Sequence, residues 1–135
     1  ESAGRSRVSD RRGKASITEF RVLQRLAGNT LVECRPLTGR MHQIRVHMAT
    51  IGHPLAVDPV YGGGEAIYLS HHKPNYRPSA RHEERPLIGR LTLHAYRLTV
   101  THPRTREKVT FEAPLPKDFR ATVNQLGRLV SGGCG

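Results

Sequence analysis

The chain has 135 residues, which is enough for one domain, or part of a larger one, with a modest hydrophobic core. Its 22 lysines and arginines outnumber 11 aspartates and glutamates, so the formal net charge is +11. This excess favours a polyanionic partner such as a nucleic acid, although a solvated basic surface accounts for it equally well. The two cysteines, Cys34 and Cys134, do not form the pattern of a disulfide-rich secreted scaffold.

No segment approaches the about 20 apolar residues that a membrane-spanning helix requires, so we expect no membrane partner. The amino terminus is rich in arginine and lacks the apolar segment of a signal peptide. Together with the cysteine usage, this predicts a reducing, cytoplasmic location. The sequence does not begin with methionine, and we therefore expect a processed or excised piece of a longer protein.

Residues 1–13 are rich in Ser, Gly and Arg and have no apolar periodicity, which indicates a flexible arm or connecting loop. Two strands are predicted after it, over residues 17–26 and 30–37, because apolar and polar side chains alternate there. The Ala-Gly-Asn stretch at 27–29 is typical of a tight turn. These segments together predict a β-hairpin that leads directly into the next element.

A short helix is predicted between Thr38, whose hydroxyl can cap the first turn, and Gly52, which suits a left-handed stop. One apolar face follows from residues spaced three and four apart: Met41, Ile44, Met48 and Ile51. Arg45 lies at the edge of this face. A guanidinium placed there can bind a carboxylate or phosphate through two parallel hydrogen bonds.

Residues 64–90 interrupt the periodicity with three prolines and several basic side chains. A loop of this length in a compact domain is usually functional or disordered. Alternation over 91–100 and 108–113, around a His-Pro-Arg-Thr turn, predicts a second hairpin.

The last predicted element is an amphipathic helix over residues 117–130, because apolar side chains recur at helical spacing. They are Phe119, Val123, Leu126 and Val130. The glycine-rich residues 131–135 are expected to be a flexible tail.

The histidines do not predict a metal site. His42 and His47 are five positions apart, which places them about 140° apart around a helix, so one metal ion could not easily bind both. His53 and the His71-His72 pair have no neighbouring cluster of Cys or carboxylates, which favours structural or solvent roles over zinc.

The stretch over residues 38–63 reads Thr-Gly-Arg-Met-His-Gln-Ile-Arg-Val-His, then Gly-His-Pro, then Asp-Pro-Val-Tyr-Gly. It closely resembles a motif near the end of the catalytic domain in the RluA family of RNA pseudouridine synthases. Met41 and Val57 depart from the usual pattern, but neither replaces a side chain with a chemical role. Similar hairpin and closing segments extend the resemblance over about residues 13–127.

The resemblance implies an α+β fold with a mixed, mostly antiparallel sheet and flanking helices, in which residues 14–130 form the C-terminal part of the catalytic domain. Members of the family isomerise uridine in RNA to pseudouridine with an essential aspartate and no cofactor. That aspartate belongs to an upstream His-Arg-Leu-Asp motif. The three aspartates of this sequence lie outside any such motif: Asp10, Asp58 and Asp118.

The resemblance therefore implies part of an enzyme that acts on ribosomal or transfer RNA and whose catalytic aspartate comes from an upstream half of the same domain. We expect this chain alone to be inactive. The alternative is a non-catalytic RNA-binding module on the same scaffold.

The resemblance also implies roles for individual residues. Arg45 corresponds to the residue that pairs with the catalytic aspartate, and Leu93 to the apolar residue beneath the target base. Arg40 and His42 are candidates for substrate binding. Three residues are candidates for a structural turn: Gly39, Asp58 and Tyr61. The residues alone leave two alternatives open. Arg45 could be a surface arginine bonded to solvent, and Arg40 could make a structural bond to a neighbouring carbonyl.

Overall fold

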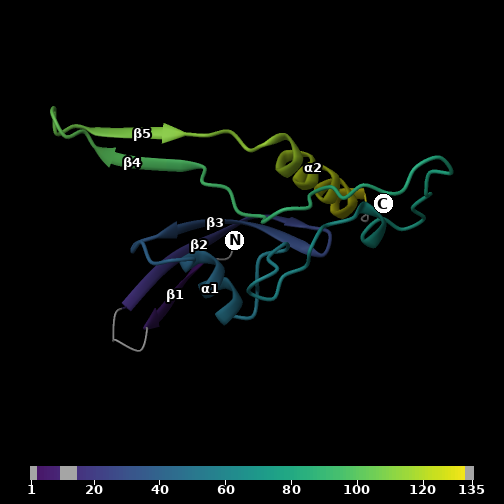
Figure 1. The fold of residues 1–135 in the computed structure, drawn as a ribbon, viewed down its shortest axis with the longest axis horizontal. Coiled ribbons are helices and arrows are strands. Elements are labelled where there is room, and N and C mark those ends of the chain that lie inside the picture. The colour runs from purple at the N-terminus through teal and green to yellow at the C-terminus, as the bar shows by residue number, and fades with distance from the viewer. Residues whose placement is uncertain (1–2, 10–14, 133–135) are drawn as a thin grey trace.

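The computed structural model describes residues 3–9 and 15–132 of the chain. The elements are β1 Ala3–Ser9, β2 Ala15–Leu26, β3 Asn29–Pro36, α1 Gln43–Thr50, the 3-10 helix η1 Leu69–His71, β4 Arg97–Thr101, β5 Lys108–Glu112 and α2 Lys117–Gly132. This confirms the α+β class, and both sheets of the described residues are antiparallel (Figure 1). The one parallel pairing in this part of the chain is an isolated bridge between Val57 and Gly64.

The larger sheet has the strand order β1-β2-β3. The first predicted hairpin is confirmed, because β2 and β3 pair from Thr18 with Pro36 to Leu26 with Asn29. Gly28 turns the chain between them at a φ of 65°, in the left-handed region that glycine adopts without strain.

The flexible arm predicted for residues 1–13 is wrong for Ala3–Ser9, which pairs with β2 as strand β1. An edge strand of this kind is held by backbone hydrogen bonds, which a search for apolar periodicity does not detect. Phe20 of β2 packs against Gly4, where a Cβ atom would lie only 2.5 Å from the ring. Residues 1–2 and 10–13 of the predicted arm lie outside the described residues, as do residues 133–135 of the predicted tail. The tail prediction is wrong for residues 131–132, which continue helix α2.

Helix α1 begins later than the predicted Thr38 cap, which is therefore wrong. The N-cap is His42, at a φ of 52° and without a capping side-chain bond. The Thr38 hydroxyl instead donates to Oε1 of Gln43 (2.6 Å) and accepts the backbone N–H of Ile17 (3.1 Å). Thr38 thus ties the hairpin to the helix and does not cap it.

The end of α1 follows the prediction. Gly52 lies in the left-handed region at a φ of 87°. Its N–H donates to the Ala49 carbonyl at 3.0 Å, and the N–H of His53 donates to the Met48 carbonyl at 2.8 Å. These two bonds are the Schellman arrangement that closes a helix at glycine.

The apolar face predicted for α1 is only partly correct. Met48 is buried and Ile44 is half-buried, whereas Ile51 is exposed and Met41 is exposed and precedes the helix. The other two side chains that α1 buries are polar: Gln43 and His47. The buried face of α1 therefore includes Gln43 and His47, which hydrogen-bond to β2. The apolar spacing in the sequence does not reveal these bonds.

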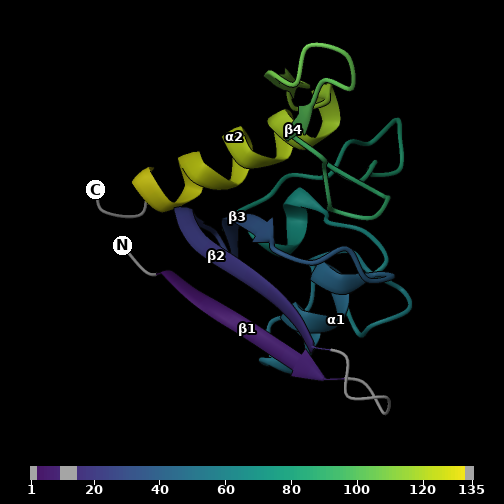
Figure 2. The ribbon, with the colours of Figure 1, turned by 90° about the vertical axis from the view of Figure 1, so that its left-hand side faces the viewer.

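The core lies where α2 meets the irregular segment that follows α1. Its buried members are Val57, Ile67, Ile88 and Leu126. The predicted helix is confirmed as α2, which crosses the turn end of β2 (Figure 2) and accepts the Ala27 N–H at the Leu126 carbonyl (3.1 Å). Residues 64–90 are irregular apart from η1, as predicted.

The second predicted hairpin is confirmed as β4 and β5, although β4 begins at Arg97 and not at residue 91. It extends away from the larger sheet (Figure 1), and every residue of β4 is exposed. Leu98 and Phe111 are cross-strand neighbours on its apolar face and are 61% and 59% exposed. In the part of the chain that the structure describes, no helix has the length and apolarity needed to cross a membrane.

Candidate functional site

Arg45, on α1, forms the most enclosed ion pair among the described residues. Its Nε and Nη2 donate to Oδ2 and Oδ1 of Asp58 at 2.9 and 2.8 Å. The two side chains are 13% and 0% exposed. Two parallel charge-assisted bonds fix the guanidinium and the carboxylate in one plane. They join helix α1 to the loop that carries Asp58.

Asp58 also organises the turn that follows it. Its Oδ1 accepts the backbone N–H groups of Val60 and Tyr61 at 3.1 and 3.2 Å. The hydrogen bonds from Arg45, and after them those from the two backbone amides, lower the pKa of Asp58 to about 2. The carboxylate is therefore charged at neutral pH.

Tyr61 and His42 extend this arrangement outward. Cζ of Arg45 lies 5.0 Å from the centre of the Tyr61 ring, a cation–π distance. The Tyr61 hydroxyl is 2.9 Å from Nδ1 of His42, and the two rings meet edge-on. The backbone of His42 is in the left-handed region, which is strained for residues other than glycine. The contact with Tyr61 helps to hold His42 in this conformation. The structure thus brings four of the sequence candidates into one cluster: Arg45, Asp58, Tyr61 and His42.

The buried amide of Gln43 anchors the cluster to β2. Its Nε2 donates to the Ile17 carbonyl (2.8 Å) and the Thr18 hydroxyl (2.9 Å). Its Oε1 accepts from the Thr38 hydroxyl and from the backbone N–H of Arg40. These bonds use the donors and acceptors of the amide fully. The sequence analysis did not single out Gln43, and its position inside the motif was the available signal.

Arg40 and Gly39 lie apart from the cluster. The Arg40 side chain is exposed and has no hydrogen bond or ion pair to the residues that the structure describes. Its guanidinium is therefore accessible to an anion. Gly39 is outside the left-handed region, and a Cβ there would meet nothing within 4 Å, so the local backbone does not require glycine.

A glycine that the sequence analysis missed is Gly63. A Cβ at this position would lie 2.0 Å from the carbonyl oxygen of Leu55 and 2.7 Å from the nitrogen of Asp58. Only glycine allows the backbone to approach so closely. The run of three glycines after Tyr61 was a visible signal for it.

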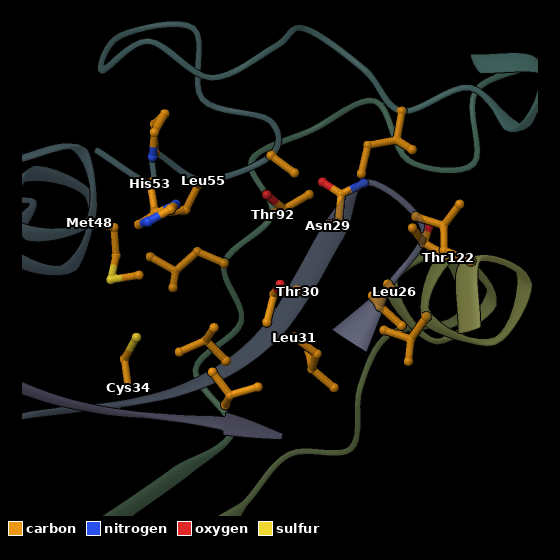
Figure 3. Close-up of a pocket in the computed structure, with 18 of the residues that line it drawn as sticks. Leu26, Asn29, Thr30, Leu31, Cys34, Met48, His53, Leu55, Thr92 and Thr122 are labelled. Atoms are coloured by element: carbon orange, nitrogen blue, oxygen red, sulfur yellow. The ribbon is translucent and has the colours of Figure 1, made fainter. Parts of the chain in front are cut away.

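Leu93 is half-buried and lines a mostly apolar cavity of about 820 Å³. Strand β3 runs along this cavity, with α1 on one side and α2 on the other (Figure 3). Labelled lining residues include Leu31, Cys34, Met48 and Thr122. Arg45 is not part of the lining, so the structure does not bring these two candidates into one pocket.

The backbone nevertheless links Leu93 to the ion pair. Thr92 accepts the Val57 N–H at its hydroxyl (3.0 Å) and donates its own N–H to the Val57 carbonyl (3.2 Å). Val57 and Asp58 are consecutive, so the segment carrying Leu93 is held beside the loop that carries Asp58. A shift of either segment disturbs both candidates.

His47 is buried one turn after Gln43. Its Nε2 lies 3.0 Å from the Ser16 hydroxyl, while its buried Nδ1 has no hydrogen-bond partner among the described residues. Burial lowers the pKa of His47. The ring is therefore neutral at pH 7 and packs α1 against β2. Nowhere in the described ranges do three His, Cys, Asp or Glu side chains gather closely enough to hold a metal ion.

The guanidinium of Arg45 has donors left over. Its Nε–Nη2 edge holds Asp58, while Nη1 makes no hydrogen bond to the described residues. Because arginine has five N–H donors in a fixed plane, it can bridge two carboxylates. The cluster can thus orient a second anion, with Asp58 and Tyr61 fixing the guanidinium.

Comparison with known proteins gives consistent similarities. The family described as RNA pseudouridylate synthase matches residues 1–50. The chain is 42% identical over 125 residues to ribosomal large subunit pseudouridine synthase D of Neisseria meningitidis, covering 89% of this chain and 30% of that protein. It is 41% identical over 114 residues to ribosomal large subunit pseudouridine synthase C of Escherichia coli, covering 84% and 32%.

An uncharacterized RNA pseudouridine synthase of Bacillus subtilis is 45% identical over 116 residues, which cover 86% of this chain and 32% of that protein. The chain therefore spans about a third of the length of these relatives.

Proposed function

Because the chain belongs to the RluA family of RNA pseudouridine synthases, we propose that it is part of an enzyme that isomerises uridine to pseudouridine in structured RNA. The observation that carries the proposal is the 42% identity over 89% of the chain. Two of the relatives are named for the ribosomal large subunit. The substrate proposed here is accordingly large-subunit ribosomal RNA.

In this proposal the catalytic aspartate comes from a segment outside the present sequence, which contains no His-Arg-Leu-Asp. Arg45 pairs with it through the Nη1 side of the guanidinium, while Asp58 keeps the opposite edge. The unused Nη1 and the 13% exposure of Arg45 support this role. A guanidinium beside a carboxylate lowers its pKa and keeps it charged, as a nucleophile or base requires.

The remaining candidates act on the RNA. Leu93 lies beneath the target base, and its apolar surroundings support that role. Arg40 binds phosphate through its exposed guanidinium. His42 contacts the substrate while Tyr61 holds its ring, which is supported by their 2.9 Å contact.

The partner of this chain is then the upstream half of the catalytic domain. Two apolar surfaces support a packing partner: the cavity beside Leu93 and the exposed face of the β4–β5 hairpin. Leu98 and Phe111 on that face expose more than half of their side chains. Exposed apolar area of this kind is favourable to cover.

The test measures tritium released from 5-labelled uridine in transcribed large-subunit ribosomal RNA. The complete protein should release tritium, and the 135-residue chain alone should release none above a protein-free control. Release by the chain alone would show that it needs no upstream aspartate. No release by the complete protein, together with salt-dependent RNA binding, would favour the non-catalytic RNA-binding module that the net charge of +11 also allows.

A further inference from the structure

Hydrogen bonds join the two limbs of the loop over residues 64–90 at two places. At its base, the Ile67 N–H donates to the Ile88 carbonyl at 2.9 Å, and the Leu87 N–H donates to the Ile67 carbonyl at 2.7 Å. Further out, the carboxylate of Glu84 accepts both the backbone N–H and the hydroxyl of Ser70. Glu84 is therefore a clasp that holds the two limbs of the loop together.

Two further contacts fix the loop beyond this clasp. Tyr76 is half-buried and hydrogen-bonded to Glu84. His72 packs against the β2–β3 turn, because a Cβ at Gly28 would lie 2.7 Å from its Cε1. Burial lowers the pKa of His72, so a neutral ring packs there at pH 7. The loop is thus attached to the larger sheet and to itself.

The outer part of the loop, residues 73–85, is here called the basic tip. Its four cations are exposed, and none forms an ion pair with the described residues: Lys73, Arg77, Arg81 and Arg85. Arg90, just outside the basic tip, is by contrast paired with Asp118 at 2.8 Å. Of the two acids in the basic tip, Glu84 faces inward to Ser70, which leaves Glu83 exposed.

The composition of the basic tip indicates which polyanion it fits. Residues 73–83 contain no Leu, Ile, Val, Met, Phe or Trp, and the single tyrosine is bonded to Glu84. A membrane surface site normally adds apolar side chains that enter the lipid. Pro74 and Pro78 restrict the backbone, which reduces the entropy lost when the loop binds a partner.

We propose that the basic tip binds RNA phosphates in the shape that the Glu84 clasp maintains. This inference rests on the proposed function and adds a second contact surface for the same RNA. The arginines and lysine reach phosphates, which position the RNA without reading its sequence. Glu84 is a positioning residue, because it acts through Ser70 and Tyr76 and touches no RNA.

The first test measures RNA binding by the complete protein from 50 to 300 mM salt. The probes are a transcribed fragment of large-subunit ribosomal RNA and a random-sequence hairpin of equal length. The double variant Arg77→Ala/Arg81→Ala should lower the salt slope of log K by about 1.4 to 1.8 on both probes, since each phosphate contact contributes about 0.7 to 0.9. The matched control is Arg120→Ala/Arg128→Ala, which removes two exposed cations of α2.

An equal change in the tip and control variants would overturn the proposal, because only net charge would then matter. Loss of binding to phosphatidylserine vesicles with unchanged RNA binding would also overturn it, in favour of a membrane surface.

The second test separates shape from charge. Glu84→Ala and Glu83→Ala each raise the net charge by one, and a surface acting by charge alone should bind RNA more tightly in both. If the clasp matters, Glu84→Ala should bind RNA more weakly and Glu83→Ala should not. Thermal unfolding of both variants checks that the fold is intact. Tighter binding by Glu84→Ala would overturn the positioning role.

The proposed function and the inference about the basic tip can be disproved independently of each other. The wild-type complete protein tests the proposed function by pseudouridine formation at saturating RNA. If it forms pseudouridine while the tip variants bind like their controls, only the inference about the basic tip is wrong.

Discussion

Arg45–Asp58 and Arg90–Asp118 are two ion pairs with the same geometry in different surroundings. In each, Nε and Nη2 of the arginine donate to the two carboxylate oxygens at 2.8 to 2.9 Å. The side chains of the first pair are 13% and 0% exposed, and those of the second are 45% and 39% exposed. Water and salt screen the second pair, and such exposed pairs add about 0 to 1 kcal/mol.

The difference shows that hydrogen-bond geometry alone does not distinguish the candidate pair from a surface pair. Asp58 accepts two further backbone amides, and Arg45 stacks on Tyr61. Water cannot replace a partner in that enclosed cluster, so removing one group leaves a charge without solvation. Asp118, at the start of α2, can be solvated when Arg90 is removed.

The largest effect expected is on stability. Asp58→Asn in the complete protein should lower the free energy of unfolding by about 3 to 5 kcal/mol, the usual loss when one member of a buried pair is removed. Asp118→Asn should lower it by about 0 to 1 kcal/mol. Urea unfolding followed by circular dichroism measures both. Similar losses in the two variants would contradict the role assigned to burial.

The next effect concerns the reaction. If Arg45 has the role proposed above, Arg45→Met should slow pseudouridine formation in single turnover by at least about tenfold, which corresponds to about 1.4 kcal/mol, because the catalytic aspartate would lose its partner. Arg45→Lys should recover only part of the rate, since an ammonium cannot make two parallel bonds. Arg90→Met is the control and should react at the wild-type rate.

RNA affinity should change less than the rate in Arg45→Met, because one contact is a small share of the electrostatic attraction. A wild-type rate with reduced RNA binding would mean that Arg45 is a phosphate contact.

The third effect is a difference between the two ion pairs in how stability depends on pH. The pKa of Asp58 is lowered to about 2, from an ordinary value of about 3.9. A lowered pKa adds stability that is complete above the ordinary value and is lost as the pH falls through about 4 toward 2. Asp58→Asn should therefore flatten the loss of stability over this window. Asp118→Asn should flatten it much less, and unfolding midpoints from pH 6 to pH 2 would show this.

The smallest effect is expected from the contact between the Tyr61 hydroxyl and His42. Tyr61→Phe removes the hydroxyl that meets His42 but keeps the ring over Arg45. It should cost about 0.5 to 1.5 kcal/mol of stability and leave the single-turnover rate close to that of the wild type. Tyr61→Leu also removes the stacking and should reduce the rate. If both variants reacted alike, the ring would have no part in orienting Arg45.

The elements of this protein were largely predictable from its sequence. Both hairpins and α2 follow from alternation and helical spacing, and Gly52 was correctly placed at the end of α1. These features depend on local backbone preferences, which neighbouring residues determine. Strand β1 was missed because its pairing with β2 relies on backbone hydrogen bonds.

The motif over residues 38–63 identified Arg45 and Asp58 as separate candidates, one on a helix and one in a turn. Their pairing across thirteen positions, and the burial of Gln43 in place of Met41, depend on how α1 packs against β2. The sequence by itself determined the family, most of the elements and the candidate side chains, because these follow from local pattern. Only the tertiary structure decided which charges lose their water, since burial depends on segments far apart in the chain.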